Sequence, residues 1–101
     1  MKTVIQSIHF NADTKLVGFI NEKMNHFDQL MQGLETKAEI ILKMENVGQI
    51  KDKIVEIILH VRGKQIVVKS IHKTFEQAVI EAVKTLKGQF IKYKDKLQRK
   101  H

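Results

Sequence analysis

Alternating apolar and polar positions predict two strands in the middle of the chain. Apolar side chains take every second place in Lys37 to Glu45, and the same period continues in Lys53 to Arg62. Residues 46–52 between them include Gly48 and are mostly polar, which predicts a loop. Because one side of each strand is apolar and the other is charged or mixed, we expect a sheet with one covered face.

Two further strands are expected, one on each side of this pair in the sequence. Thr3 to His9 predicts a short first strand, although its alternation is imperfect. Gln65 to Ile71 predicts a fourth strand after a tight hairpin at Gly63-Lys64. A glycine in the first position of that turn suits type II′.

Apolar residues spaced by three and four predict two amphipathic helices. Asp13 can cap the first helix, which should end near Gly33. Its apolar stripe contains Leu16, Ile20, Phe27 and Met31. Thr74 and Gln77 form a capping box at the start of the second helix. The stripe of that helix contains Phe75, Val79, Ala82, Leu86, Phe90, Tyr93 and Leu97.

The predicted order is β-α-β-β-β-α, which indicates an α+β fold. We expect a four-stranded mixed sheet with both helices packed on one face. With 101 residues the chain can build one hydrophobic core, so residues 1–101 should form a single domain. The absence of cysteine leaves no disulfide framework and no thiolate metal site. Neither a signal peptide nor a membrane span is evident, so we expect a cytoplasmic protein without a membrane partner.

Positive charge is concentrated at the end of the chain. Residues 84–101 contain seven basic residues and one acid, a net +6 out of the +7 of the whole chain. The basic residues are Lys84, Lys87, Lys92, Lys94, Lys96, Arg99 and Lys100. This face is either a solvated lysine-rich surface or a surface that binds a polyanion. An exposed helix usually mixes both signs and gains i,i+4 pairs, whereas bound phosphates would offset this repulsion. The outer face lacks the Trp, Phe or Leu that a membrane-surface helix would bury, and two isolated outward residues, Ile80 and Ile91, are normal on a surface, so nucleic acid is the favoured partner.

Lys23 and Gly88 each allow two interpretations. Lys23 lies within the apolar stripe of the first helix, so it either extends past the core to solvent or lines a groove shared with the last helix. Gly88 lies inside the last helix, where glycine is unfavourable. It is either simply tolerated or allows an RNA backbone to approach closely.

Candidate catalytic and metal-binding residues are not evident. The histidines fall on different predicted elements without metal-ligand spacing, at His9, His26, His60, His72 and His101. No glycine-rich phosphate loop is present, and no serine or acid pair has catalytic spacing. We therefore expect no enzyme activity, no metal, no cofactor and no small-molecule substrate.

The sequence resembles the ribosome hibernation promoting factor family, also called the ribosome-associated translation inhibitor or sigma-54 modulation protein family. The likeness covers the whole chain and is carried by three stretches. They are Val4-Ile5-Gln6-Ser7-Ile8-His9-Phe10 with the capped helix after it, Asn46 to Ile57, and Thr74-Phe75-Glu76-Gln77-Ala78-Val79 running into the lysine-rich end. The second stretch is similar to a Bacteroidetes-like branch, and the end at His101 resembles a short form. The chain departs from the family pattern at Thr74-Phe75-Glu76 and at Gly88.

The resemblance implies a ribosome hibernation factor that inhibits translation under stress. Members of the family bind the small ribosomal subunit between its head and body, where they block messenger and transfer RNA. Carried over by position, the rRNA-binding residues would be Lys15, Lys23, Lys84, Lys87, Lys92, Lys94, Lys96 and Arg99. We expect a monomer when the protein is free of the ribosome.

Two other functions fit parts of the sequence. A generic double-stranded RNA-binding domain shares the β-β-β-α tail, but its usual lysine cluster before the last helix is reduced here to Lys73. A protein-interaction module that modulates a sigma factor would need an exposed apolar patch, of which the sequence gives little sign.

Overall fold

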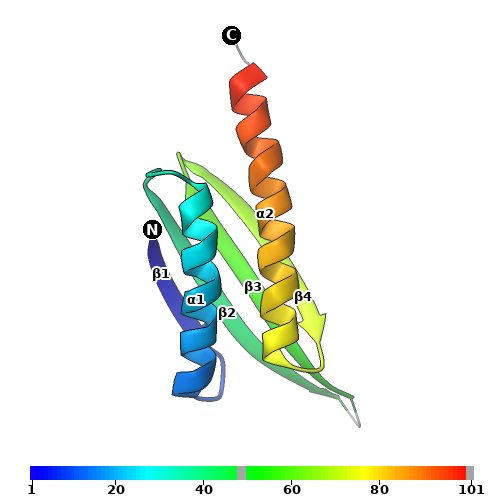
Figure 1. The fold of residues 1–101 in the computed structure, drawn as a ribbon. Helices are drawn as coiled ribbons and strands as arrows, with labels where there is room; N and C mark the ends of the chain where they lie inside the picture. Colours follow the sequence, from blue (N-terminus) through cyan, green and yellow to red (C-terminus); the bar gives the residue numbers. More distant parts are fainter. Residues whose placement is uncertain (48–49, 100–101) are drawn as a thin grey trace.

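The four strands form one mixed sheet that carries both helices on the same face (Figure 1). The computed structural model describes residues 1–47 and 50–99. Its elements are β1 (Lys2–Ser7), α1 (Thr14–Leu30), β2 (Thr36–Val47), β3 (Ile50–Val61), β4 (Lys64–His72) and α2 (Phe75–Arg99). In the sheet order β1-β2-β3-β4, β1 and β2 are parallel and the other neighbours are antiparallel. The predicted fold is confirmed.

The core fills the space between the sheet and the two helices. Because side chains alternate across a strand, Ile40, Ile57 and Leu59 point to the covered face, where they are almost fully buried. Phe27 of α1 and Phe90 of α2 meet edge to face above them, with their ring centroids 5.7 Å apart. This aromatic contact ties the helices to each other. The predicted apolar stripe is confirmed as buried over the whole of α1, and over α2 except in its C-terminal part.

That exception is the last part of α2, which continues beyond the sheet (Figure 1). Leu97 was expected in the buried stripe, yet it is 43% exposed and Tyr93 is only partly buried. Their spacing is correct for an amphipathic helix, but Tyr93 lies at the edge of the sheet, beside β4, and Leu97 lies farther out along α2. Leu97 is exposed because α2 is longer than the sheet on which it packs.

The loop predicted for residues 46–52 is wrong over most of its length. β2 continues to Val47 and β3 begins at Ile50, with Asn46 opposite Lys51 in the register. Gly48 lies outside the described residues. This end of the hairpin extends past the start of α2 (Figure 1). A strand that lacks a covering helix can be polar on both faces, so its composition resembles that of a loop.

The turn between β3 and β4 is shifted by one residue from the prediction. Its central residues are Arg62 and Gly63, with φ angles of 49° and 73°, and Val61 pairs with Lys64. Two positive φ values define a type I′ turn, in place of the expected type II′. Lys64 therefore belongs to β4.

Hydrogen bonds at the helix starts agree with the predicted caps. Asp13 Oδ1 accepts from the Leu16 N–H at 2.7 Å, and Thr74 Oγ1 accepts from the Gln77 N–H at 3.2 Å. The first strand is shorter than expected, because β1 ends at Ser7 and His9 adopts a positive φ of 64°. The caps fix where each helix begins, and the buried apolar stripes turn the polar residues of both helices away from the sheet.

Candidate nucleic-acid interface

The lysines of α2 lie on its exposed side. The side of α2 opposite its apolar stripe carries Lys84, Lys87, Gly88, Ile91 and Asp95, and all five are exposed. The flanking lysines 92, 94 and 96 are exposed as well. Within residues 1–47 and 50–99, none of these α2 lysines takes part in an ion pair. Their charge is therefore available to a partner.

A groove between α1 and α2 brings basic residues from both helices together. Lys23 and His26 of α1 line it with Lys84 and Lys87 of α2, above Phe27 and Val83, and its volume is about 260 Å³. We call this surface the helix groove. The Nζ of Lys23 lies 5.3 Å from the centroid of the Phe19 ring, one turn earlier on α1. Of the two interpretations of Lys23, the groove position is confirmed.

The remaining candidate residues do not join the helix groove. Lys92 and Lys96 lie on the β4 side of α2, in a hollow that they share with Lys64 and Tyr93. The Nζ of Lys64 lies 5.5 Å from the centroid of the Tyr93 ring. Lys94 lines another hollow with Arg62 and Leu97.

Two candidates stand apart from these groups. Lys15 is the second residue of α1, about 12 Å along the helix axis from Lys23. It is exposed but does not line the helix groove. Arg99 is the last residue of α2, and its side chain lies outside the described residues.

Three basic residues near these surfaces were not expected from the sequence. They are His26, Arg62 and Lys64, and each lines one of the hollows that contain the candidate lysines. For Arg62 and Lys64, the feature of the sequence that could have indicated a basic surface is that they flank Gly63 in a turn. The shift of that turn places Lys64 on the covered side of the sheet, near Tyr93.

The open face of the sheet has a different charge pattern. Its lysines and acids alternate with the core residues, and several of them pair with each other. Lys43 Nζ lies 3.0 Å from Glu56 Oε1, and the His60 Nε2–H donates to Glu39 Oε2 at 2.8 Å. The hydrogen bond from His60 lowers the pKa of the Glu39 carboxyl. A face with paired charges attracts phosphate less than the helix side does.

Gly88 lies next to these lysines and has open space around it. A Cβ added to Gly88 would meet no atom within 4 Å. We therefore expect Gly88→Ala to raise the free energy of unfolding by about 1 kcal/mol, because alanine is the better helix former. Thermal unfolding checks this value. If the protein binds ribosomes, as its sequence resemblance implies, we expect Gly88→Ala to leave that affinity within about twofold of the wild type, since neutral side chains contribute little to phosphate binding. A larger fall in affinity would show that RNA backbone approaches Gly88.

The histidines and acids do not gather into a metal site. Among the described residues, no group of three His, Cys, Asp or Glu side chains could hold a metal ion. His60 pairs with Glu39, His72 pairs with Glu81, and His26 lies in the helix groove. No helix within the described ranges is long and apolar enough to cross a membrane.

Comparison with known proteins identifies the family. The chain is similar in structure to a ribosomal subunit interface protein from Coxiella burnetii, with a TM-score of 0.82, 17% identity, and coverage of 94% of this chain and 99% of that one. It is also similar to the N-terminal domain of Thermus thermophilus Protein Y, with a TM-score of 0.78, 18% identity, and coverage of 92% and 99%. No curated protein sequence matches the chain. The family model described as sigma 54 modulation protein / S30EA ribosomal protein matches residues 3–98. The chain therefore belongs to the sigma 54 modulation protein / S30EA ribosomal protein family.

Proposed function

We propose that this protein is a ribosome hibernation factor that binds rRNA of the small ribosomal subunit in the decoding channel. Residues 1–101 act as a single ribosome-binding domain. The bound protein occupies the path of messenger and transfer RNA and so inhibits translation. The helix side of the molecule faces the rRNA, and the open face of the sheet points away from it.

The segregation of charge carries this proposal. The α2 lysines have no ion-pair partner in the described part of the chain, and three lysines from two helices line one groove. Like charges held together cost free energy, which a bound phosphate backbone offsets by releasing counterions. Structured RNA is recognised largely through its backbone and shape, for which exposed lysines are sufficient. A neutral or basic partner would leave this repulsion unrelieved.

The family and the similar structures support the ribosome as the source of those phosphates. The family description includes a ribosomal protein, and the Coxiella burnetii protein is named a ribosomal subunit interface protein. The dimensions are consistent with an elongated binding site, because the molecule measures 53 × 25 × 20 Å and α2 forms one end of it (Figure 1).

Co-sedimentation with purified small ribosomal subunits across a salt series tests the proposal. We expect binding at low salt, with the logarithm of the affinity falling linearly against the logarithm of the salt concentration. The slope should be roughly −2 to −3 if the three groove lysines make the contacts, and roughly −6 to −7 if all eight candidate residues do.

Duplex RNA serves as the control for this experiment. A generic double-stranded RNA-binding domain would bind a duplex of about 16 base pairs as tightly as it binds the small subunit. Preferential binding to the small subunit supports the proposed function. Equal affinity for the duplex would support the generic domain, and no sedimentation with small subunits at low salt would contradict both the site and the function.

A further inference from the structure

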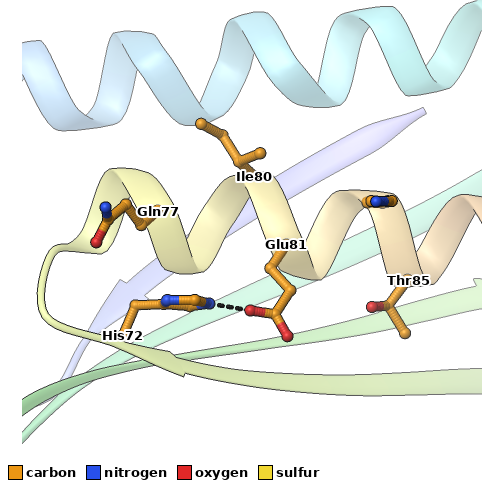
Figure 2. Close-up of a pocket in the computed structure, with 6 residues that line it drawn as sticks. His72, Gln77, Ile80, Glu81 and Thr85 are labelled. Atoms are coloured by element: carbon orange, nitrogen blue, oxygen red, sulfur yellow. Dashed lines mark hydrogen bonds and ion pairs between the residues drawn. The ribbon is translucent and has the colours of Figure 1, made fainter.

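Another hollow, separate from the three described above, lies across α2 from the helix groove, near the end of β4. Its volume is about 720 Å³, and it is lined by His72, Gln77, Ile80, Glu81, Lys84 and Thr85 (Figure 2). Ile80 and Lys84 also line the helix groove, so these two side chains separate the two hollows. A phosphate held by Lys84 would therefore lie at the edge of both.

Glu81 is an unexpected residue on a surface that would bind phosphates. The His72 Nε2–H donates to Glu81 Oε2, and Figure 2 shows the two side chains pointing toward each other. The Glu81 side chain is 53% exposed, and its other carboxylate oxygen, Oε1, has no hydrogen-bond partner among the described residues. A carboxylate repels phosphate, so RNA can approach Glu81 only with a group that donates a hydrogen bond.

The other side chains around the hollow fit a nucleobase. Ile80 is 51% exposed and offers an aliphatic surface to the face of a base or to a sugar. The amide of Gln77 can both donate and accept along the edge of a base. Unstacked bases in RNA loops are commonly held in this way, by side-chain contact with the ring and hydrogen bonds to its edge.

We propose that this hollow receives one unstacked RNA base that carries an exocyclic amino group. The amino group donates to Glu81 Oε1, as carboxylates accept from the N4 amino group of cytosine in other complexes, and the phosphate of the same nucleotide pairs with Lys84. His72 positions Glu81 by holding its Oε2. Uracil presents a carbonyl oxygen where cytosine presents the amino group, so it is disfavoured at this site. This inference rests on the proposed function, because it requires that the helix side binds RNA.

Two fluorescently labelled RNA octamers, one of cytidine and one of uridine, test the inference directly. The two bases differ at position 4, which carries an amino group in cytosine and a carbonyl oxygen in uracil, and at N3, which accepts a hydrogen bond in cytosine and donates one in uracil. We expect the full chain to bind the cytidine octamer roughly tenfold more tightly at neutral pH and constant salt, because one hydrogen bond to a charged group is gained. Fluorescence anisotropy measures both affinities. Equal affinity for the two octamers would overturn the inference.

Glu81→Gln and Glu76→Gln form a matched pair of variants. Both remove one negative charge from an exposed position on α2, but only Glu81 lines the hollow. We expect Glu81→Gln to remove most of the preference for cytidine and Glu76→Gln to retain it. Thermal unfolding confirms that both variants are folded. An equal change of preference in the two variants would also overturn the inference, because only net charge would then matter.

Co-sedimentation separates this inference from the proposed function. If the wild type sediments with small subunits but does not discriminate between the octamers, the base site is wrong and the proposed function stands. If it prefers cytidine but does not sediment with small subunits, the base site stands and the ribosome is the wrong RNA. The two failures therefore give different results.

Discussion

Replacing the three lysines of the helix groove by alanine should reduce the affinity for small ribosomal subunits by roughly 100-fold near 0.15 M salt. The variant combines Lys23→Ala, Lys84→Ala and Lys87→Ala, which removes the lysines that α1 and α2 bring together. The salt dependence should also become shallower, with its slope changing by roughly 2 to 3, because each lost phosphate contact contributes 0.7 to 0.9. Co-sedimentation across a salt series measures both effects.

The fold of this variant should remain intact. Alanine is a good helix former, and all three lysines lie at the surface of the helices. The loss of the contact between Lys23 and the Phe19 ring should cost roughly 0.5 to 1 kcal/mol of stability. Thermal unfolding should therefore show only a small shift.

Lys2, Lys37 and Lys69 provide a matched control on the other side of the molecule. They are exposed, and alternation along β1, β2 and β4 places them on the open face of the sheet. Replacing them by alanine removes the same charge as the groove variant. We expect less than about a threefold loss of affinity, because these charges act on bound RNA only over a distance that salt screens. If the two triple variants weakened binding equally, net charge alone would determine affinity and the groove assignment would be wrong.

The fold could be predicted from the sequence because each element carries its own period. Strands with a covered face alternate, as at Ile40 and Leu42, and both helices repeat their apolar residues at three and four. The outer part of the β2–β3 hairpin was predicted as a loop, because alternation is not required there. This part has no helix over it, so polar residues are allowed on both faces.

The grouping of the basic residues could not be predicted in the same way. Lys23 and Lys84 are 61 positions apart in the sequence, and their meeting depends on how α1 and α2 pack together. In the sequence, the lysines from 84 to 96 look like one cluster. A helix rotates by about 100° per residue, so Lys92 and Lys94 lie on different sides of α2 and line different hollows. The structure therefore separates one charged segment into three surfaces.

The position of Lys64 shows how one residue in a turn changes a site. With the predicted turn, Lys64 would have been a turn residue. With Arg62 and Gly63 at the centre, it becomes the first residue of β4, and its side chain lies near Tyr93 of α2. Because side chains alternate along a strand, Lys64 then shares the covered face with Ile66 and Val68, so the position of the turn decides whether this charge adds to the helix side.

The protein should inhibit initiation when it is added to a bacterial cell-free translation reaction. If it occupies the decoding channel, it competes with messenger RNA and initiator transfer RNA for the same space. Inhibition should therefore be strong at a small molar excess over ribosomes, and it should weaken when messenger and initiator transfer RNA are bound to the subunits first. Reporter synthesis measures the first effect, and filter binding of labelled initiator transfer RNA to small subunits measures the second.

The two triple variants make this test specific. The groove variant should inhibit only at roughly 100-fold higher concentration, in proportion to its lost affinity, whereas the control with alanine at Lys2, Lys37 and Lys69 should inhibit like the wild type. This parallel between binding and inhibition is expected only if the same surface serves both. A wild-type protein that sediments with small subunits but leaves translation unchanged at several-fold excess would bind outside the decoding channel. In that case the helix groove would remain an RNA-binding surface, and the proposed inhibition would be wrong.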